Sequence, residues 1–276
     1  MSETTVGEMT FIQHLEVLRY HLMRSAIAIL VLAIAAFVNK SFLFDTVIFG
    51  PKRSDFFTFQ KLCEFSGFLS EKVPSLVEDS SLLCIGQDFP PLQNIDMAGQ
   101  FTSHIMVSMI AGLVLSFPYI LWELWRFIKP GLEQNESKYA RGLVFWASLL
   151  FATGVLFGYY VIAPLSVNFF FTYSISPEVQ TLPTLSAYVS TVTGVVLAAG
   201  IVFELPLIVY FLSKVGILSP EILRKYRKHF VVAALILSAI ITPPDIFSQI
   251  LVTIPLVILY EISIRISGRV IALNAK

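Results

Sequence analysis

The sequence predicts an all-α membrane protein with six transmembrane helices, and two measures of composition lead to that prediction. Of the 276 residues, 56% are hydrophobic and only 14% are charged, whereas soluble domains contain about 25% charged residues. The mean hydropathy is +0.77. This composition excludes an ordinary cytosolic enzyme and a disordered protein, because neither could coat or solvate so much apolar surface. The net charge is zero, so no nucleic-acid partner is indicated.

Six apolar stretches follow one another along the chain. A helix needs about 20 residues to cross about 30 Å of hydrocarbon. The expected spans are Ser25–Val38 (which can begin near Tyr20), His104–Leu124, Gly142–Phe171, Ala187–Leu212, His229–Ile241 and Ile246–Tyr260. The last two are short, and the fifth would rise only about 20 Å. We expect this pair to lie in thinned lipid or against its neighbours; a re-entrant hairpin that does not cross is the alternative.

The distribution of Lys and Arg predicts the orientation of these helices. Segments 1–24, 125–141, 213–228 and 265–276 carry 14 of the 19 basic residues, and segment 39–103 carries the other five. Cytoplasmic loops are enriched in basic residues, so both termini are expected in the cytoplasm. The whole chain, 1–276, is interpreted as a single integral membrane domain with an extended outer loop at 41–102.

The outer loop contains both cysteines of the chain, Cys63 and Cys84. A disulfide between them is possible if the loop lies in an oxidising compartment, and two free thiols are the alternative. No histidine lies in this loop, so a zinc site is not expected there. The chain contains no phosphate-binding loop, zinc-protease helix or nucleophile elbow. Neither an enzyme nor a cofactor is predicted.

Glu204 is the acidic residue that lies well inside an expected span, two residues before Pro206. A charge in the bilayer is costly, so this carboxyl group should face a groove or water, or be protonated. Pro206 cannot complete the helical hydrogen bonds and can bend the helix there. A proton-coupled solute transporter with Glu204 as its intramembrane site is therefore an alternative function. Such transporters usually have broken helices in both halves, whereas this site falls in one half only.

Four strings, in order along the chain, resemble signatures of the TatC family. They are His14-Leu15-Glu16-Val17-Leu18-Arg19, Trp125-Arg126-Phe127-Ile128-Lys129-Pro130-Gly131-Leu132 followed by Glu136, Phe203-Glu204-Leu205-Pro206, and Thr242-Pro243-Pro244-Asp245-Ile246-Phe247-Ser248-Gln249. They match that family's amino-terminal segment, first cytoplasmic loop, fourth span and outer turn between the short fifth and sixth helices. The resemblance covers nearly the whole chain.

TatC is the signal-receptor subunit of the twin-arginine translocase, which exports folded proteins with the proton-motive force. The resemblance implies a receptor and scaffold in the bacterial inner membrane, not an enzyme. It implies that Glu136 receives the paired arginines of the signal peptide, with Phe127, Glu16 and Arg19 nearby. A planar guanidinium can pair with a carboxylate through two parallel hydrogen bonds, which a lysine cannot reproduce.

The resemblance also implies a partner surface and a shape. Glu204 would lie in the concave face of a glove-shaped bundle. Gln249 would help to dock single-span TatA or TatB subunits beside the outer turn formed by Pro243, Pro244 and Asp245. Self-association in a receptor complex would follow.

Two features depart from the family pattern. Val17 stands where the amino-terminal signature usually has Glu, and Glu16 precedes it. One residue turns a helical side chain by about 100°. The periplasmic loop at 41–102 is longer than usual, and its cysteines are not part of the pattern. The resemblance therefore assigns no role to this loop.

Overall fold

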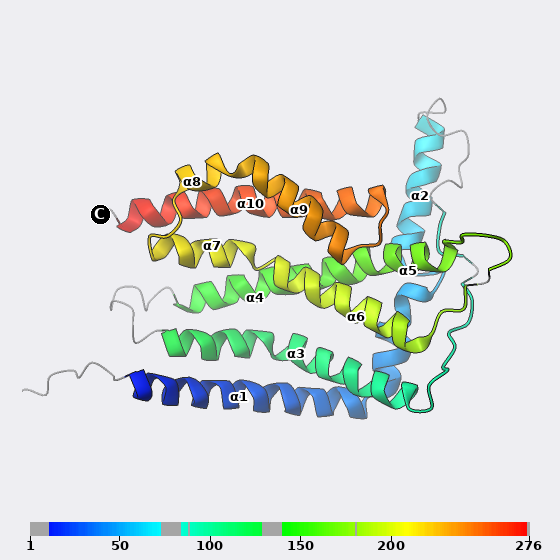
Figure 1. Cartoon of the computed structure of the whole chain (residues 1–276), viewed down its shortest axis with the longest axis horizontal. Helices are drawn as coiled ribbons and strands as arrows, with labels where there is room; N and C mark the ends of the chain where they lie inside the picture. The colour runs from blue at the N-terminus through cyan, green and yellow to red at the C-terminus, as the bar shows by residue number, and fades with distance from the viewer. Residues whose placement is uncertain (1–10, 73–83, 88, 129–139, 180, 275–276) are drawn as a thin grey trace, which may run out of the picture. The chain divides into compact units, whose positions relative to one another are not determined.

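The structure is a computed structural model that describes residues 11–72, 84–87, 89–128, 140–179 and 181–274 (Figure 1). Within these residues every regular element is helical, and the one β pairing is an isolated bridge between Gln93 and Thr184. The predicted all-α membrane class is confirmed. Five of the described helical stretches are long and apolar enough to cross a membrane: Leu15–Val38, Gly99–Ile128, Gly142–Thr172, Leu185–Lys214 and Ser248–Ala272.

The helices follow the predicted order with different bounds. They are α1 (Phe11–Val38), α2 (Phe57–Lys72), α3 (Gly99–Ile128), α4 (Ala140–Phe157), α5 (Ala163–Thr172), α6 (Leu185–Val202), α7 (Leu205–Lys214), α8 (Pro220–Lys225), α9 (Arg227–Ile241) and α10 (Ile246–Asn274). The short π-helical turn η5 (Gly158–Ile162) joins α4 to α5, and η1 (Phe42–Ile48) and η2 (Gly50–Lys52) follow α1.

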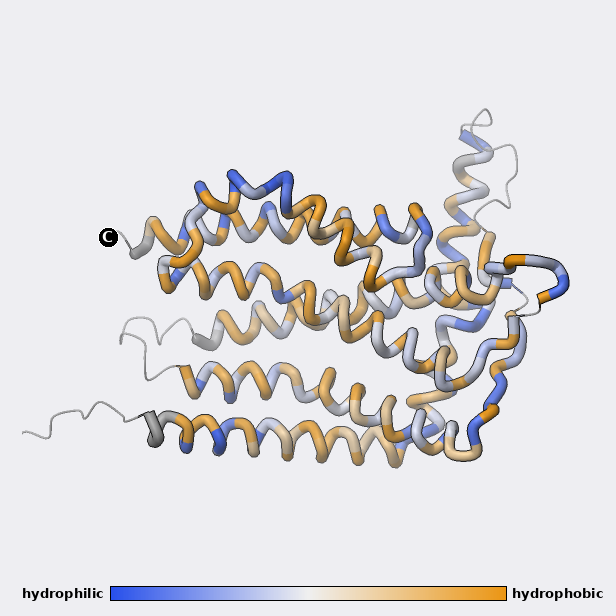
Figure 2. Tube along the Cα trace, viewed as in Figure 1, coloured by the Kyte–Doolittle hydropathy of each residue, from blue (hydrophilic) through white to orange (hydrophobic). Residues whose placement is uncertain are grey.

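The chain divides into two compact units. The first contains residues 1–39 and 108–149, and the second contains residues 40–107 and 150–276. Figure 2 shows that hydrophobic residues dominate the long helices, while hydrophilic residues gather in α8 and at the start of α9. This pattern is typical of membrane helices, whose sides contact lipid and whose ends contact water.

In the first unit, α1 packs closely against α3 at Gly112. A Cβ atom at this position would lie 2.6 Å from the carbonyl oxygen of Ile29 and 2.8 Å from the Cβ of Ala33. Without a hydrophobic driving force between helices in lipid, such close approach through small residues supplies the packing energy.

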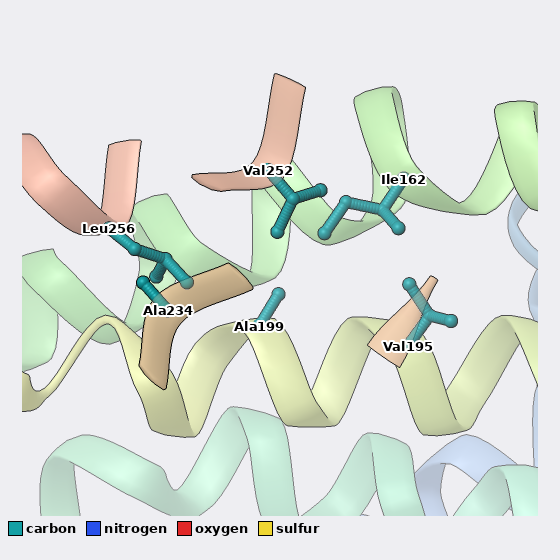
Figure 3. Close-up of a cluster of buried hydrophobic side chains, with 6 residues drawn as sticks. All are labelled: Ile162, Val195, Ala199, Ala234, Val252 and Leu256. Atoms are coloured by element: carbon teal, nitrogen blue, oxygen red, sulfur yellow. The ribbon is translucent and has the colours of Figure 1, made fainter. Parts of the chain in front are cut away.

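In the second unit, a seam of small residues joins α4 and η5 to α6. A Cβ at Gly154 would lie 2.7 Å from the carbonyl oxygen of Ala199, and one at Gly158 would lie 2.9 Å from the Cα of Val196. The two backbones therefore touch directly. Beside this seam lies the core shown in Figure 3, which draws residues from η5, α6, α9 and α10: Ile162, Val195, Ala199, Ala234, Val252 and Leu256.

The fourth predicted span is interrupted, as Pro206 suggested. Helix α6 ends at Val202 and α7 begins at Leu205, so Phe203 and Glu204 form the connection. Pro206 occupies the first turn of α7, where a missing N–H costs nothing. In an uninterrupted helix, Pro206 would leave the carbonyl of Val202 without an N–H donor.

The last helix is a correction to the sequence prediction. Ile246–Tyr260 was expected as the second member of a short pair, but α10 has 29 residues; only α9, with 15 residues, is short. The charged residues that follow this apolar stretch recur every fourth position, at Glu261, Arg265 and Arg269. They therefore lie along one side of the helix, while its other side remains buried against α7 and α8.

Polar contacts along that buried side fix α10 in the second unit. The Ser213 hydroxyl of α7 donates to the Ser267 hydroxyl at 2.8 Å, and the Tyr260 hydroxyl donates to the carbonyl of Leu223 at 2.8 Å. The rings of Tyr260 and Phe230 stack at 3.9 Å between centroids. These contacts explain why the helix continues past Tyr260.

Helix α2 and the segment that returns from it form a small structure within the outer loop. A disulfide joins Cys63 of α2 to Cys84. Gly86 then turns with φ of 86°, against the ring of Phe59, where a Cβ would lie 2.5 Å from a ring carbon. Its N–H donates to the side-chain oxygen of Asn168 in α5 at 3.1 Å. The disulfide and Gly86 thus fix α2 to the second unit.

We expect Cys63 and Cys84 to be bridged in protein taken from the membrane. Alkylation without reductant should add no mass, and reduction should expose two thiols. In the chain-entropy model a bridge over this separation of 21 residues stabilises the folded loop by about 3 kcal/mol. Reduction should therefore loosen α2, detectable as faster proteolysis of the loop. Two labelled cysteines before reduction would contradict the bridge.

Candidate functional site

The residues predicted to receive the signal peptide lie in the first unit, as far as they are described. Glu16 and Arg19 are exposed on α1, and Phe127 is half-buried in the last turn of α3. Glu136 lies outside the described residues. Residues 16 and 19 are three apart on a helix, so they share one face of α1.

A buried carboxylate lies at the same end of α3, one helical turn before Phe127. The side chain of Glu123 is only 1% exposed. Its Oε2 lies 2.5 Å from Nδ1 of His21 on α1, and its Oε1 lies 3.2 Å from Nη1 of Arg126. The Arg24 guanidinium approaches to 4.0 Å, and the Tyr119 hydroxyl also lies near this carboxylate. We call these five residues the Glu123 cluster.

Helical spacing places the members of the Glu123 cluster. Arg126 is three residues after Glu123, and Tyr119 is four residues before it, so all three share one side of α3. His21 and Arg24 are likewise three apart on α1. Burying a carboxylate is costly unless it is paired and hydrogen-bonded, and His21, Arg24 and Arg126 perform that role here. The cluster therefore ties the ends of α1 and α3 together.

The Glu123 cluster also positions Phe127. The ring of Phe127 meets the ring of His21 edge to face, with 6.2 Å between their centroids. His21 is in turn fixed by Glu123. Phe127, to which the family resemblance assigns a role in signal binding, thus packs against His21. The buried carboxylate of Glu123 orients His21.

Sequence reasoning missed Glu123. Glu123 lies between Trp122 and Trp125 at the end of the expected span His104–Leu124, whereas Glu204 lies deeper within an apolar run. The structure places Glu123 inside α3 and Glu204 in the connection between α6 and α7. The available signal was a pair of basic residues three positions apart at the start of the preceding span, His21 and Arg24. An acidic residue at the same end of the next span is the expected partner for such a pair.

In the second unit, Glu204 lies in the connection between α6 and α7. It is 7% exposed, and neither of its carboxyl oxygens accepts a hydrogen bond from the described residues. The backbone N–H of Phe151 lies within electrostatic reach of the carboxyl group without forming a bond of normal geometry. An acidic side chain that is buried without a partner is unusual. It contrasts with Glu123, whose oxygens are both occupied.

The predicted outer turn connects α9 to α10. Asp245 caps α10, because its Oδ1 accepts a hydrogen bond from the N–H of Ser248 at 2.8 Å. Pro243 and Pro244 precede it between the two helices. The Gln249 amide donates to the carbonyl of Leu235 in α9 at 3.1 Å. Gln249 therefore has a role within the hairpin, in addition to any role in docking a partner.

The described residues contain no cluster of three or more His, Cys, Asp or Glu side chains that could hold a metal ion. The groups at the Glu123 cluster are a carboxylate, two guanidinium groups, a phenol and an imidazole. The carboxylate is paired with the basic groups around it. This arrangement is suited to holding two helices and presenting basic side chains, of which Arg24 and Arg126 are about half exposed.

Comparison with known proteins agrees with the resemblance seen in the sequence. A family model described as Sec-independent protein translocase protein (TatC) matches residues 13–255. The protein of that name from Blattabacterium sp. subsp. Periplaneta americana is 40% identical over 261 residues, which cover 95% of this chain and 96% of that protein. The one from Aquifex aeolicus is 33% identical over 260 residues, 93% of each.

Two solved structures are also similar. Both are crystal structures of the twin-arginine translocase receptor TatC, and both are 30% identical in sequence. They cover 92% of this chain and 97% and 99% of their own, with TM-scores of 0.61 and 0.66. The similarity therefore extends over the spans of both units.

Proposed function

Because the chain belongs to the TatC family of Sec-independent protein translocase proteins, we propose that it is the receptor subunit of a twin-arginine translocase. In this role it binds the signal peptides of folded precursor proteins at the cytoplasmic face of the bacterial inner membrane. It then recruits single-span partner subunits for export driven by the proton-motive force. The family consists of translocase components and not of enzymes, in agreement with the lack of catalytic motifs.

The observation that carries this proposal is the full-length similarity to two structures named as twin-arginine translocase receptors. The distribution of basic residues supports the orientation, with both termini and the loop between α3 and α4 in the cytoplasm. In that orientation Glu16, Arg19, Phe127 and Glu136 belong to the cytoplasmic side of the chain.

Glu136 is proposed to accept the two arginines of the signal peptide. A carboxylate in a cytoplasmic loop forms charge-assisted, bidentate bonds with guanidinium groups. Phe127 supplies an apolar contact for the signal peptide, held by His21 of the Glu123 cluster. Gln249 and the turn at Pro243, Pro244 and Asp245 are proposed to belong to the docking surface for TatA/TatB-type subunits.

Glu136→Gln tests the signal-binding proposal. The amide keeps the size and one acceptor but loses the charge, so we expect binding of a twin-arginine precursor to weaken roughly 5- to 150-fold, or about 1–3 kcal/mol. Affinity should be measured with the full chain in membrane vesicles, and membrane insertion should be unchanged.

Glu133→Gln is the matched control, because Glu133 carries the same charge three residues away in the sequence. Glu133→Gln should weaken precursor binding far less, because only general electrostatic attraction is lost. Salt screens that attraction over about 8 Å. A precursor with both arginines replaced by lysine should bind poorly to the unmodified chain and lose little more on Glu136→Gln. Equal losses for the two glutamates would refute the pairing.

A further inference from the structure

Helix α2 carries an exposed strip of aromatic and basic residues. Its opposite side is covered by the chain, because Phe59 is 2% exposed and Ser66 is fully buried. At about 100° per residue, five exposed residues fall within an arc of about 80° on the free side. We call them the aromatic–lysine strip: Phe57, Lys61, Phe65, Phe68 and Lys72.

The strip is apolar to an unusual degree for a surface that faces water. The side chains of Phe57, Phe65 and Phe68 are 58%, 52% and 54% exposed. The acidic residues of α2 lie beside the strip and not within it: Glu64 and Glu71 occupy the adjoining arc with Gln60. This separation of aromatic, basic and acidic residues is typical of a helix that lies at a membrane surface.

The start of α2 lies at the depth of a membrane interface. The Thr58 hydroxyl donates to the carbonyl of Tyr160 in η5, and the rings of Phe57 and Tyr160 meet edge to face at 6.0 Å. The membrane span that contains Tyr160 begins at Gly142. Tyr160 is 18 residues further along, which corresponds to a rise of about 27 Å. The hydrocarbon core is about 30 Å thick. Tyr159, Tyr160 and the Phe side chains packed on them thus form an aromatic belt.

From this level α2 runs crosswise to α5 and α10, as Figure 1 shows. Because α10 spans the membrane, a helix that crosses it extends along the membrane plane. The disulfide between Cys63 and Cys84 and the contacts of Gly86 hold α2 in this direction. The strip is therefore presented at a fixed depth.

We propose that α2 is an interfacial helix whose aromatic–lysine strip binds phospholipids of the outer leaflet. The phenylalanine rings lie below the headgroups, and Lys72 extends to the phosphates, as long basic side chains do at interfaces. Lys61, which pairs with Glu64 at 2.6 Å, lies beside the headgroups. Glu64 and Glu71 face water. This surface is continuous with the lipid-facing spans through Phe57 and Tyr160, which favours lipid over a protein partner. The inference goes beyond signal reception and does not depend on it.

Site-specific photocrosslinking of the full chain tests this proposal. p-Benzoylphenylalanine replaces Phe65 or Phe68 in one set of variants and Gln60 or Glu71 in the control set, all on the same helix. After illumination in native membrane vesicles, mass spectrometry identifies what is attached. We expect phospholipid adducts at Phe65 and Phe68 to exceed those at Gln60 and Glu71 several-fold. Protein adducts at Phe65 and Phe68, or equal lipid adducts at all four positions, would overturn the proposal.

A second pair of variants separates lipid binding from folding. Phe65→Asp with Phe68→Asp should leave the Cys63–Cys84 bridge intact and reduce lipid adducts from a probe at Phe57 several-fold. The matched change Gln60→Asp should leave those adducts unchanged. Undiminished adducts in the double variant with the bridge intact would contradict the proposal. Precursor binding serves as the separate readout of receptor function, and it should not change in either variant.

Discussion

Glu123→Ala is expected to destabilise the protein by about 3 kcal/mol, the low end of the range for breaking a buried ion pair. The low end applies because Arg24 and Arg126 are about half exposed, and water stabilises the charges that lose their partner. His21, which is 14% exposed, has less access to water and loses its principal contact. The free energy of unfolding can be measured by denaturant titration in detergent with a helix-sensitive signal.

The control for this change is an ion pair at the surface. Glu64 lies 2.6 Å from Lys61 on α2, and both side chains are more than half exposed, so Glu64→Ala should cost at most about 1 kcal/mol. Glu123→Ala combined with His21→Ala should cost less than the sum of the two single changes, because the two groups contact each other. Equal costs for Glu123 and Glu64, or strict additivity with His21, would show that the cluster does not stabilise the helix pair.

Precursor binding provides a second readout of the Glu123 cluster. If His21 holds Phe127 in place, Glu123→Ala should weaken precursor binding even in conditions where the protein remains folded. Glu64→Ala should not. Loss of stability without any change in precursor binding would leave the cluster as a purely structural feature.

Glu204→Leu is expected to raise stability and slow export. Its carboxyl group is buried without a hydrogen-bond partner among the described residues, so an apolar side chain of similar size should gain about 1–3 kcal/mol. Export would slow several-fold if the polar group is needed at the connection between α6 and α7. Glu204→Ala should also slow export and remain folded, but it gains less stability, because it leaves a cavity.

Glu204→Gln distinguishes two roles for this residue. The amide keeps a polar group at the same place but cannot release a proton at any ordinary pH. Export that is retained in Glu204→Gln and lost in Glu204→Leu would indicate a need for polarity alone. Loss in both would indicate a need for the ionisable group. Unfolding together with lost export in Glu204→Leu would instead mark Glu204 as a structural residue.

The sequence predicted most helices of this protein because membrane spans depend on a local property, the length of an apolar run. The interruption at Glu204 and Pro206 was also predictable, since proline acts on its own helix. The extension of α10 was not, because Glu261, Arg265 and Arg269 break an apolar run without breaking a helix whose other side is buried.

The candidate site was predictable only where a sequence signature exists. Glu136, Phe127 and Gln249 were found through family strings. No sequence signature identifies Glu123, and its contacts depend on where α1 places His21 and Arg24. Contacts between helices depend on rotation and register, which apolar periodicity does not specify in a helix surrounded by lipid. Cys63 and Cys84 could be paired only because the loop contains no other cysteine.

The break between α6 and α7 gives the two halves of one apolar stretch different close neighbours within the second unit. Helix α6 is locked to α4 and η5 by the glycine seam at Gly154 and Gly158, while α7 is joined to α10 through Ser213 and Ser267. Phe203 and Glu204 lie between these two sets of contacts, while α6 also packs on α9 and α10 in the core of Figure 3. The buried acid thus lies where one set of packing contacts ends and the next begins, so a substitution at Glu204 would act on both.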